Sequence, residues 1–403
     1  MKYDALIIGS GPAGGTAALL LAKAGWSVAV VEKANFPRRK VCGEFISATS
    51  LPLFHELGIA RPFFELAGSE VHEVGLFAGE TVLTAAMPRL QNSTEIWGRA
   101  LGRDHLDMLL LTGVAAAGAR VCQPCTVVEL QRVNESFICK TAAKGSMKEL
   151  QARVVIAAHG SWERGALPTQ TIHQAPRPSD MFAFKAHFRE CHLPPELMPL
   201  LIFPGGYGGM VHSDNHRVSF SCCIRRDYLQ RLRRELPGTN AAEAVLKHIR
   251  VSCRGVREAL SRAWLEDTWL SVGPIRPGIR KRYLEGIFLL GNAAGEAHPI
   301  VAEGISMAMQ SAWLLCEHLI GRQKEVLTGR GIEAVGKDYS SVWNASFAPH
   351  IRAAAVFAHL AMRPGTAAML LPILKLFPEI LTLGAKLSGK AKQVITMPQP
   401  QVS

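Results

Sequence analysis

Three glycines and one acidic residue near the start of the chain have the types and spacing needed to hold a dinucleotide. Gly9, Gly11 and Gly14 follow an apolar run, and Glu32 stands 18 positions after Gly14. Glycine at these positions allows a tight turn, lets the backbone approach a pyrophosphate and lets a helix pack on a strand. The carboxylate can accept hydrogen bonds from both hydroxyls of an adenosine ribose, and it would repel a 2′-phosphate.

The segments around these residues predict the elements that position them. Residues 3–8 are typical of a buried strand, residues 13–24 of an apolar helix, and residues 27–31 of a second strand that leads to Glu32. The helix N-terminus would present free N–H groups and a partial positive charge to the phosphates. A glycine spacing alone also occurs in ordinary turns, but this complete βαβ unit favours dinucleotide binding.

Three further motifs follow in order along the chain. They are residues 36–44 (FPRRKVCGE), residues 103–110 (RDHLDMLL) and residues 291–309, which begin with GNAAG and continue with Pro299 and EGI. Together with the glycine loop they resemble FAD-dependent oxidoreductases of the geranylgeranyl reductase type, within the larger group of para-hydroxybenzoate-hydroxylase-fold flavoproteins. The resemblance covers roughly residues 1–320 and implies that the glycine loop binds FAD rather than NAD.

The glycine loop and the resemblance together assign a set of cofactor-binding residues. In this family the helix expected over residues 304–320 points its positive N-terminal end at the flavin, which would stabilise an anionic reduced flavin. The same segment also has the pattern of a core helix, and both roles can coexist. The assigned residues are Gly9, Gly11, Pro12, Ala13, Gly14, Glu32, Lys33, Lys40, Cys42, Gly43, Arg103, Gly291, Asn292, Ala293, Pro299, Glu303, Gly304 and Ile305.

The sequence departs from the family pattern in three places. Asn292 stands where an Asp is usual, although an amide can still bond the oxygens of a ribityl chain. His159-Gly160 replaces the Asp-Gly pair of the hydroxylases, which weakens the case for a hydroxylase. The YxWxFP substrate motif of the reductases is not found, with Phe203-Pro204 and Tyr207 near its expected place. The WxWxIP motif of the related halogenases is also missing, so a halogenase is less favoured.

Cys42 is the candidate catalytic residue. It corresponds to the cysteine of the PxxKxCG loop, which in the reductases lies near the flavin and substrate, and the basic residues before it would stabilise a thiolate. The alternative is that Cys42 only fills space above the flavin ring. Three histidines, His55, His159 and His298, are each expected to be structural, although His298 lies inside the flavin motif.

Composition limits the class of protein and its partners. A chain of 403 residues favours two lobes. The formal charge of +12 is spread over scattered basic pairs, which argues against a nucleic-acid partner and favours an acidic cofactor or anionic lipid. The cysteines are nine in number, and no signal peptide precedes the glycine loop, so we expect a reduced cytoplasmic protein. Cys122 and Cys125 have CxxC spacing without a second pair, and no metal site is expected.

The changes of pattern along the chain predict an α/β fold. A doubly wound, Rossmann-like FAD-binding domain is expected from residues 1–65, 99–165 and 275–330. It is interleaved with an antiparallel-sheet substrate domain from residues 66–98 and 166–274. Residues 331–403 are expected to form a C-terminal helical region.

The C-terminal tail over residues 353–392 is strongly apolar but is interrupted by prolines and charges. A membrane-spanning helix needs about 20 apolar residues in a row, so a span is not expected. The tail would cap the substrate entrance or lie on a bilayer surface, with Lys386, Lys390 and Lys392 meeting anionic headgroups. The alternative is simple packing on the core.

These patterns predict an FAD-dependent oxidoreductase acting on a hydrophobic isoprenoid or polyketide-like substrate. The favoured reaction is reduction of a carbon–carbon double bond by hydride from reduced flavin, with NAD(P)H or another external donor returning the electrons. An aromatic or polyketide monooxygenase is the first alternative, and a non-catalytic flavin-dependent carrier is the second. The sequence does not predict the oligomeric state.

Overall fold

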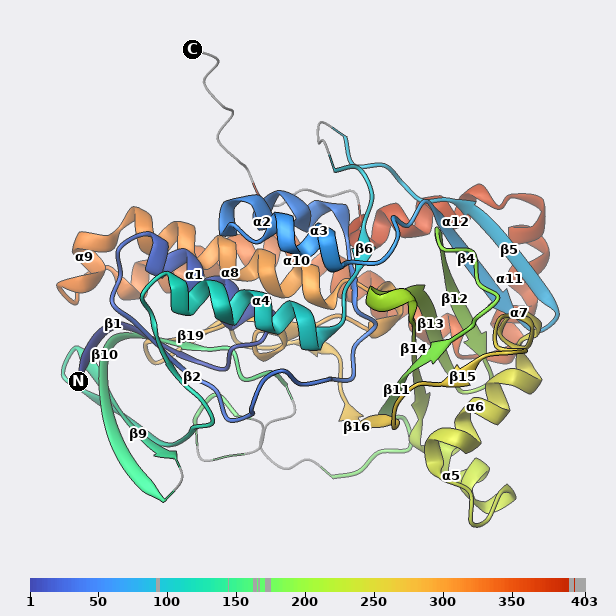
Figure 1. Ribbon diagram of the computed structural model, residues 1–403, viewed down its shortest axis with the longest axis horizontal. Helices are drawn as coiled ribbons and strands as arrows, with labels where there is room; N and C mark the ends of the chain where they lie inside the picture. Colours follow the sequence, from blue (N-terminus) through green and yellow to red (C-terminus); the bar gives the residue numbers. More distant parts are fainter. Residues whose placement is uncertain are drawn as a thin grey trace.

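The structure has two lobes that lie side by side along the long axis of the molecule (Figure 1). It is a computed structural model, and it describes residues 1–91, 95–143, 145–161, 165, 167–170, 175–390 and 395. The fold is α/β, as predicted, with one eight-stranded sheet in each lobe.

The first lobe is built on a mainly parallel sheet in the order β18-β19-β10-β1-β2-β7. Its central strand β1 is flanked by β2 and β10. All of β2 and β19 and the last four residues of β1 and β10 are buried, and these residues are mainly Val, Ile, Leu and Ala. Two further strands, β8 and β9, extend the sheet in antiparallel pairing with the early part of β10. The strands are β1 (Lys2–Ile8), β2 (Val28–Val31), β7 (Arg120–Cys122), β8 (Thr126–Val133), β9 (Ser136–Ala143), β10 (Ser146–Ala157), β18 (Tyr283–Leu284) and β19 (Ile287–Leu289).

Helix α1 (Pro12–Lys23) follows β1 and packs against α4 (Arg103–Ala116) and α8 (Gly304–Gly321). Gly14 has the packing role that its motif position predicts, because a Cβ there would lie 1.8 Å from the carbonyl oxygen of Gly9. The smaller elements of this lobe are β3 (Phe45–Ile46), α2 (Leu51–Leu57), α3 (Ala60–Leu66), β6 (Arg99–Ala100), β17 (Gly278–Ile279), β20 (Gly295–Glu296) and α9 (Gln323–Leu327).

The second lobe is built on a sheet in the order β15-β11-β14-β13-β12-β4-β5, with β16 also paired to β11. Its pairings are antiparallel except for β4 with β12, which run parallel because the chain enters the lobe twice. Helices α5 (Arg226–Glu235), α6 (Ala241–Ser252) and α7 (Arg254–Ala259) contribute to its core. The strands are β4 (Glu73–Ala78), β5 (Thr81–Ala86), β11 (Met181–Arg189), β12 (Leu197–Phe203), β13 (Gly206–His212), β14 (Val218–Arg225), β15 (Trp264–Leu265) and β16 (Leu270–Ile275).

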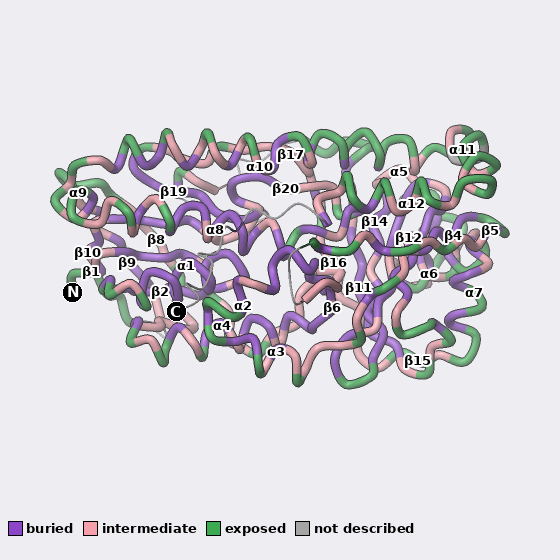
Figure 2. Tube along the Cα trace, turned by 90° about the horizontal axis from the view of Figure 1, so that it is seen from above, coloured by how far each residue is buried: buried purple, intermediate pink, exposed green. Residues whose placement is uncertain are grey.

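The C-terminal region is helical, as predicted, and joins the two lobes. Helix α10 (Ile332–Ala361) has 30 residues, a length of about 45 Å, and runs from the first lobe toward the second (Figure 2). Helices α11 (Pro364–Leu376) and α12 (Glu379–Ala385) and a π-helical turn at Lys386–Lys390 complete it. Helix α12 contacts β4 and β5. Within the described residues, no helix has the length and apolarity needed to cross a membrane.

Candidate active site

A cavity of about 850 Å³ lies between the lobes and the C-terminal helices. Its wall is formed by the carboxyl end of β1, the start of α1, residues 38–45, strands of the second sheet, and the flavin motif around residues 291–305. The sequence motifs that are far apart in the chain therefore meet at one site.

Fifteen of the eighteen residues assigned from the sequence line this cavity. Gly14, Ala293 and Glu303 do not: Gly14 packs under the glycine loop, Ala293 is buried, and Glu303 forms an ion pair described below. The fifteen are Gly9, Gly11, Pro12, Ala13, Glu32, Lys33, Lys40, Cys42, Gly43, Arg103, Gly291, Asn292, Pro299, Gly304 and Ile305.

The glycine loop and Glu32 form one end of the cavity. Gly9 has a φ of +98°, so the turn out of β1 requires glycine there. No side chain caps the start of α1, which leaves its first N–H groups facing the site. The Glu32 carboxylate is held at both oxygens: Oε2 accepts from the Ser10 N–H at 2.9 Å, and Oε1 accepts from the Ala34 N–H at 2.9 Å. This end fits the pyrophosphate and ribose of a dinucleotide.

Basic side chains add positive charge to this end. Arg103 lies beside Gly11, where a Cβ would be 3.3 Å from the guanidinium, and Asp107 holds Arg103 through two hydrogen bonds of 2.7 Å. Burial, together with the nearby guanidinium groups of Arg103 and Arg38, lowers the pKa of Lys40 to about 8. An anionic ligand would relieve this repulsion, so the cluster also fits FAD.

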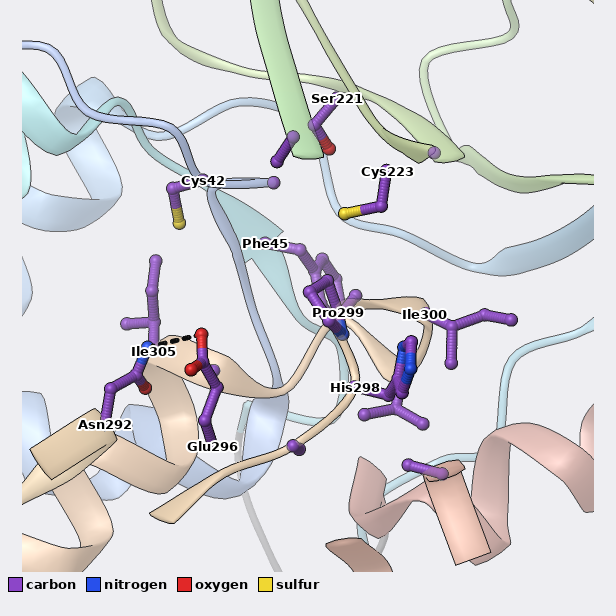
Figure 3. Close-up of a pocket in the computed structure, with 18 of the residues that line it drawn as sticks. Cys42, Phe45, Ser221, Cys223, Asn292, Glu296, His298, Pro299, Ile300 and Ile305 are labelled. Atoms are coloured by element: carbon purple, nitrogen blue, oxygen red, sulfur yellow. Dashed lines mark hydrogen bonds between the residues drawn. The ribbon is translucent and has the colours of Figure 1, made fainter. Parts of the chain in front are cut away.

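Cys42 lies on the wall between the glycine loop and the flavin motif. Its sulfur points across the cavity toward Ile305, near the start of α8 (Figure 3). It accepts a hydrogen bond from the Glu44 N–H at 3.4 Å, and its interaction with Arg103 helps to raise the pKa of that guanidinium. The structure therefore places Cys42 on the cavity wall, and its position beside the flavin and its role in the reaction stay predictions.

Glu44 anchors the Cys42 loop, and the sequence did not single it out. It is fully buried, has a φ of +66°, and its carboxylate pairs with Lys185 and with His187 at 2.9 Å on β11. Burial raises the pKa of this carboxyl, but Lys185 and His187 outweigh that effect and hold the pKa well below its usual range. Both partners lie about 140 residues away, so no local pattern reveals the pairing.

Asn292, which replaces the usual Asp of the flavin motif, is held by a nearby glutamate. Asn292 donates from Nδ2 to the Oε1 of Glu296 at 3.1 Å (Figure 3), and Arg280 lies 3.4 Å from the other oxygen of that carboxylate. Glu296 lines the cavity and is almost fully buried. A carboxyl group four residues further on therefore lies beside the amide that replaces the usual Asp, and Arg280 pairs with it.

A tyrosine–histidine pair lies on the wall in the other half of the cavity. The Tyr207 hydroxyl and the His298 Nδ1 are 2.5 Å apart. Burial lowers the pKa of His298 to about 4, and burial together with Cys223 and Glu296 raises the pKa of Tyr207 well above its usual range. With these pKa shifts we expect both groups to be neutral at pH 7, with one hydrogen bond between the hydroxyl and Nδ1. The cavity wall around them is largely apolar, with Leu76, Ala183, Leu200, Ile202, Ile275 and Ile300.

The other histidines considered in the sequence lie in two different places. His55 pairs with Glu95 at 2.8 Å near the surface, whereas His159 bonds to Thr169 at 3.0 Å and lines the cavity. All nine cysteines are free thiols, including Cys122 and Cys125.

A model of the FAD binding domain family matches residues 2–346 of this chain. The chain belongs to this family. It is 26% identical to digeranylgeranylglycerophospholipid reductase 1 of Methanopyrus kandleri, over 85% of this chain and 83% of that protein. The structure is similar to that of a flavin-dependent brominase (TM-score 0.78, 18% identity, 97% and 94% of the two chains). It is also similar to a geranylgeranyl bacteriochlorophyll reductase-like protein from Thermoplasma acidophilum (TM-score 0.69, 18% identity, 96% and 99% of the two chains).

The family membership identifies the protein as an FAD-dependent oxidoreductase. The two solved structures share its fold although their names describe different reactions, so the fold does not decide between reactions.

Proposed function

We propose that this oxidoreductase reduces a carbon–carbon double bond in a hydrophobic, isoprenoid or polyketide-like substrate. The observation that carries the proposal is the single cavity, which joins a dinucleotide-binding end to a largely apolar half that contains a neutral proton donor. The name of the Methanopyrus kandleri relative supports an isoprenoid lipid as the substrate class.

The residues of the chain have separate tasks in this reaction. The start of α1 and the cations Lys40 and Arg103 bind the anionic part of FAD, and Glu32 binds its ribose. Reduced FAD supplies a hydride, and NAD(P)H or another external donor returns the two electrons. The apolar wall excludes water and orients the substrate, and Cys42 shapes the wall near the reacting bond.

Adding a hydride to an alkene also requires a proton at the other carbon. The Tyr207 hydroxyl holds a proton on the cavity wall, and His298 can replace it through the short hydrogen bond between the two side chains. The proton leaves the tyrosine Oη for the substrate carbon, and water restores it by way of the imidazole. One hydride and one proton together convert the double bond to a single bond.

The proposal is tested by the mass of the product. The protein is incubated without oxygen with dithionite as reductant and a lipid extract rich in unsaturated isoprenoids, and the lipids are then analysed by mass spectrometry. The expected product has gained two hydrogen atoms for each double bond reduced. A product that forms only in air and has gained an oxygen atom would replace the reductase proposal with a monooxygenase.

A further inference from the structure

The C-terminal helices carry most of the large hydrophobic side chains that the structure exposes. Of eighteen such side chains among the described residues, eleven lie within residues 356–387. We call residues 356–390 the lid, because they cover one end of the cavity. The eleven are Val356, Phe357, Leu360, Met369, Leu370, Ile373, Leu376, Phe377, Ile380, Leu383 and Leu387.

Helix α11 is apolar on two faces. Leu371 and Leu374 point to the cavity, whereas Met369 and Leu376 are 76% and 75% exposed and do not line it. A surface helix normally presents polar residues on its outward face. Figure 2 shows that the outward parts of α11 and α12 are exposed, so this apolar face lies on the surface of the chain. An exposed apolar patch of this kind marks a surface that binds a protein partner or a membrane.

The cavity opens among the same side chains. Six large hydrophobic residues both line the cavity and are exposed at the surface, so they form the rim of an opening. A ligand that passes between them stays in contact with apolar atoms. The six are Phe357, Leu360, Leu370, Ile380, Leu383 and Leu387.

The charges of the lid indicate the kind of partner. Arg352, Arg363, Lys375 and Lys386 are exposed on or beside it, and Glu379 is the sole acidic residue between positions 352 and 390. An apolar patch with a cationic fringe complements an anionic bilayer surface. Two copies of the chain meeting through their lids would instead bring two cationic fringes together.

The lid is firmly attached to the flavin motif. Lys390, at its end, is buried, lies 2.9 Å from the Glu303 carboxylate, and donates to the carbonyl oxygen of Val301 at 2.5 Å. The prediction that Lys390 meets lipid headgroups is therefore wrong, because Lys390 forms an ion pair with the buried carboxylate of Glu303, 87 residues earlier in the chain. Lys386 is exposed, and Lys392 lies outside the described residues. At the other side, Thr382 donates to the Ala86 carbonyl oxygen at the end of β5 at 2.6 Å.

We propose that the lid docks on the surface of an anionic lipid bilayer and that hydrophobic substrate passes from the bilayer into the cavity between the six rim residues. The attachment through Lys390 and Thr382 keeps the opening at the docked face. This proposal does not depend on which reaction the flavin performs.

The test is co-sedimentation with phosphatidylcholine vesicles that contain or lack phosphatidylglycerol, at low and high salt. The test variant is Met369→Ser/Leu376→Ser/Phe377→Ser, whose side chains are exposed and do not line the cavity. The matched control is Val251→Ser/Trp264→Ser/Leu265→Ser, which also removes three exposed hydrophobic side chains. Trp264 and Leu265 lie in β15, at the opposite edge of the second sheet from β5.

We expect the lid variant to bind anionic vesicles at least tenfold more weakly and the control to bind like the unmodified chain. Lys375→Glu/Lys386→Glu should weaken binding to the anionic vesicles and flatten its salt dependence. Equal pelleting of the lid variant and the control would overturn the proposal. So would lid-dependent dimerisation in the absence of lipid, measured by sedimentation velocity, because the partner would then be a second copy. The amount of bound FAD, measured in every variant, reports whether the chain is folded. The test does not require the enzyme to turn over substrate.

Discussion

The two ends of the cavity are built in different ways. The dinucleotide end is polar, and its main residues come from one βαβ unit in which each contact partner lies nearby in the chain, as with Ser10, Glu32 and Ala34. The lid end is apolar and is assembled from the second sheet and the C-terminal helices, which are hundreds of residues apart. Contacts within the βαβ unit are therefore encoded locally, whereas Arg103, the flavin motif around residues 291–305 and the substrate compartment join this unit only in the folded chain.

The largest predicted effect is a loss of stability on breaking the buried ion pair between Glu44 and Lys185. Glu44→Ala leaves the Lys185 ammonium buried without its carboxylate, and loss of one partner of a buried pair costs about 3–5 kcal/mol of unfolding free energy. Urea unfolding of the apoprotein measures this loss of unfolding free energy. The double variant Glu44→Ala/Lys185→Met removes both charges and should recover part of the lost unfolding free energy. If both variants are equally unstable, the pair is not what stabilises this loop.

Gly11→Val should remove FAD without changing the lid. The side chain would enter the space beside Arg103 and block the close approach of a pyrophosphate, so we expect about a hundredfold weaker binding, or about 2.7 kcal/mol. Glu32→Arg should also release FAD, because the ribose acceptor is lost. The measurement is flavin absorbance per protein after desalting. Met369→Ser at the lid is the control and should keep its flavin; a fully yellow Gly11→Val protein would show that the glycine loop has been misinterpreted.

Tyr207→Phe should slow the reaction in the apolar half of the cavity and leave FAD binding unchanged. It removes the hydroxyl beside His298, and a positioned general acid contributes about 10²-fold or more. Reoxidation of reduced flavin by an alkene should slow by that factor, while FAD content and reoxidation by ferricyanide stay unchanged. An unchanged rate with the alkene would exclude Tyr207 as the proton donor.

Cys42→Ala tests the boundary between the two ends. FAD content should stay intact, because no dinucleotide contact is assigned to the thiol, but flavin reoxidation by alkene should slow about tenfold, equal to about 1.4 kcal/mol of transition-state stabilisation. Cys125→Ala, at another free thiol on the cavity wall that has no contact with Tyr207, is the matched control. Loss of FAD in Cys42→Ala would assign the thiol to cofactor binding instead.

The smallest effect is a pH dependence of FAD binding. Lys40 has a pKa of about 8 in the free protein, and an anionic ligand would raise that pKa, so binding takes up a proton above pH 8. Affinity should be constant below about pH 7 and fall about fivefold between pH 8 and 9. Flavin fluorescence titrations measure it. Lys40→Gln should bind FAD more weakly at pH 7, and its affinity should no longer fall between pH 8 and 9. If the affinity still falls with pH in this variant, another titratable group causes the fall.

Local motifs could be predicted from the sequence, whereas contacts between distant residues could not. The glycine loop, Glu32 and the helices of the tail follow from local turn chemistry and periodicity, and they were predicted. The partners of Glu44, the pairing of Tyr207 with His298 and the burial of Lys390 depend on residues 87 to 143 positions apart, for which neither periodicity nor spacing gives a signal. The sequence predicts a structural role for His298 and shows no sign of its contact with Tyr207 on the cavity wall.

In the proposed reaction, reduced flavin at one end of the cavity reacts directly with an alkene held at the other. Anaerobic stopped-flow absorbance tests it: the flavin is reduced with dithionite, excess reductant is removed, and a geranylgeranyl lipid is added in detergent. We predict that the oxidised flavin spectrum returns without oxygen, at a rate that rises with lipid concentration. A flavin that stays reduced until oxygen is admitted, and then yields an oxygenated product, would contradict the account.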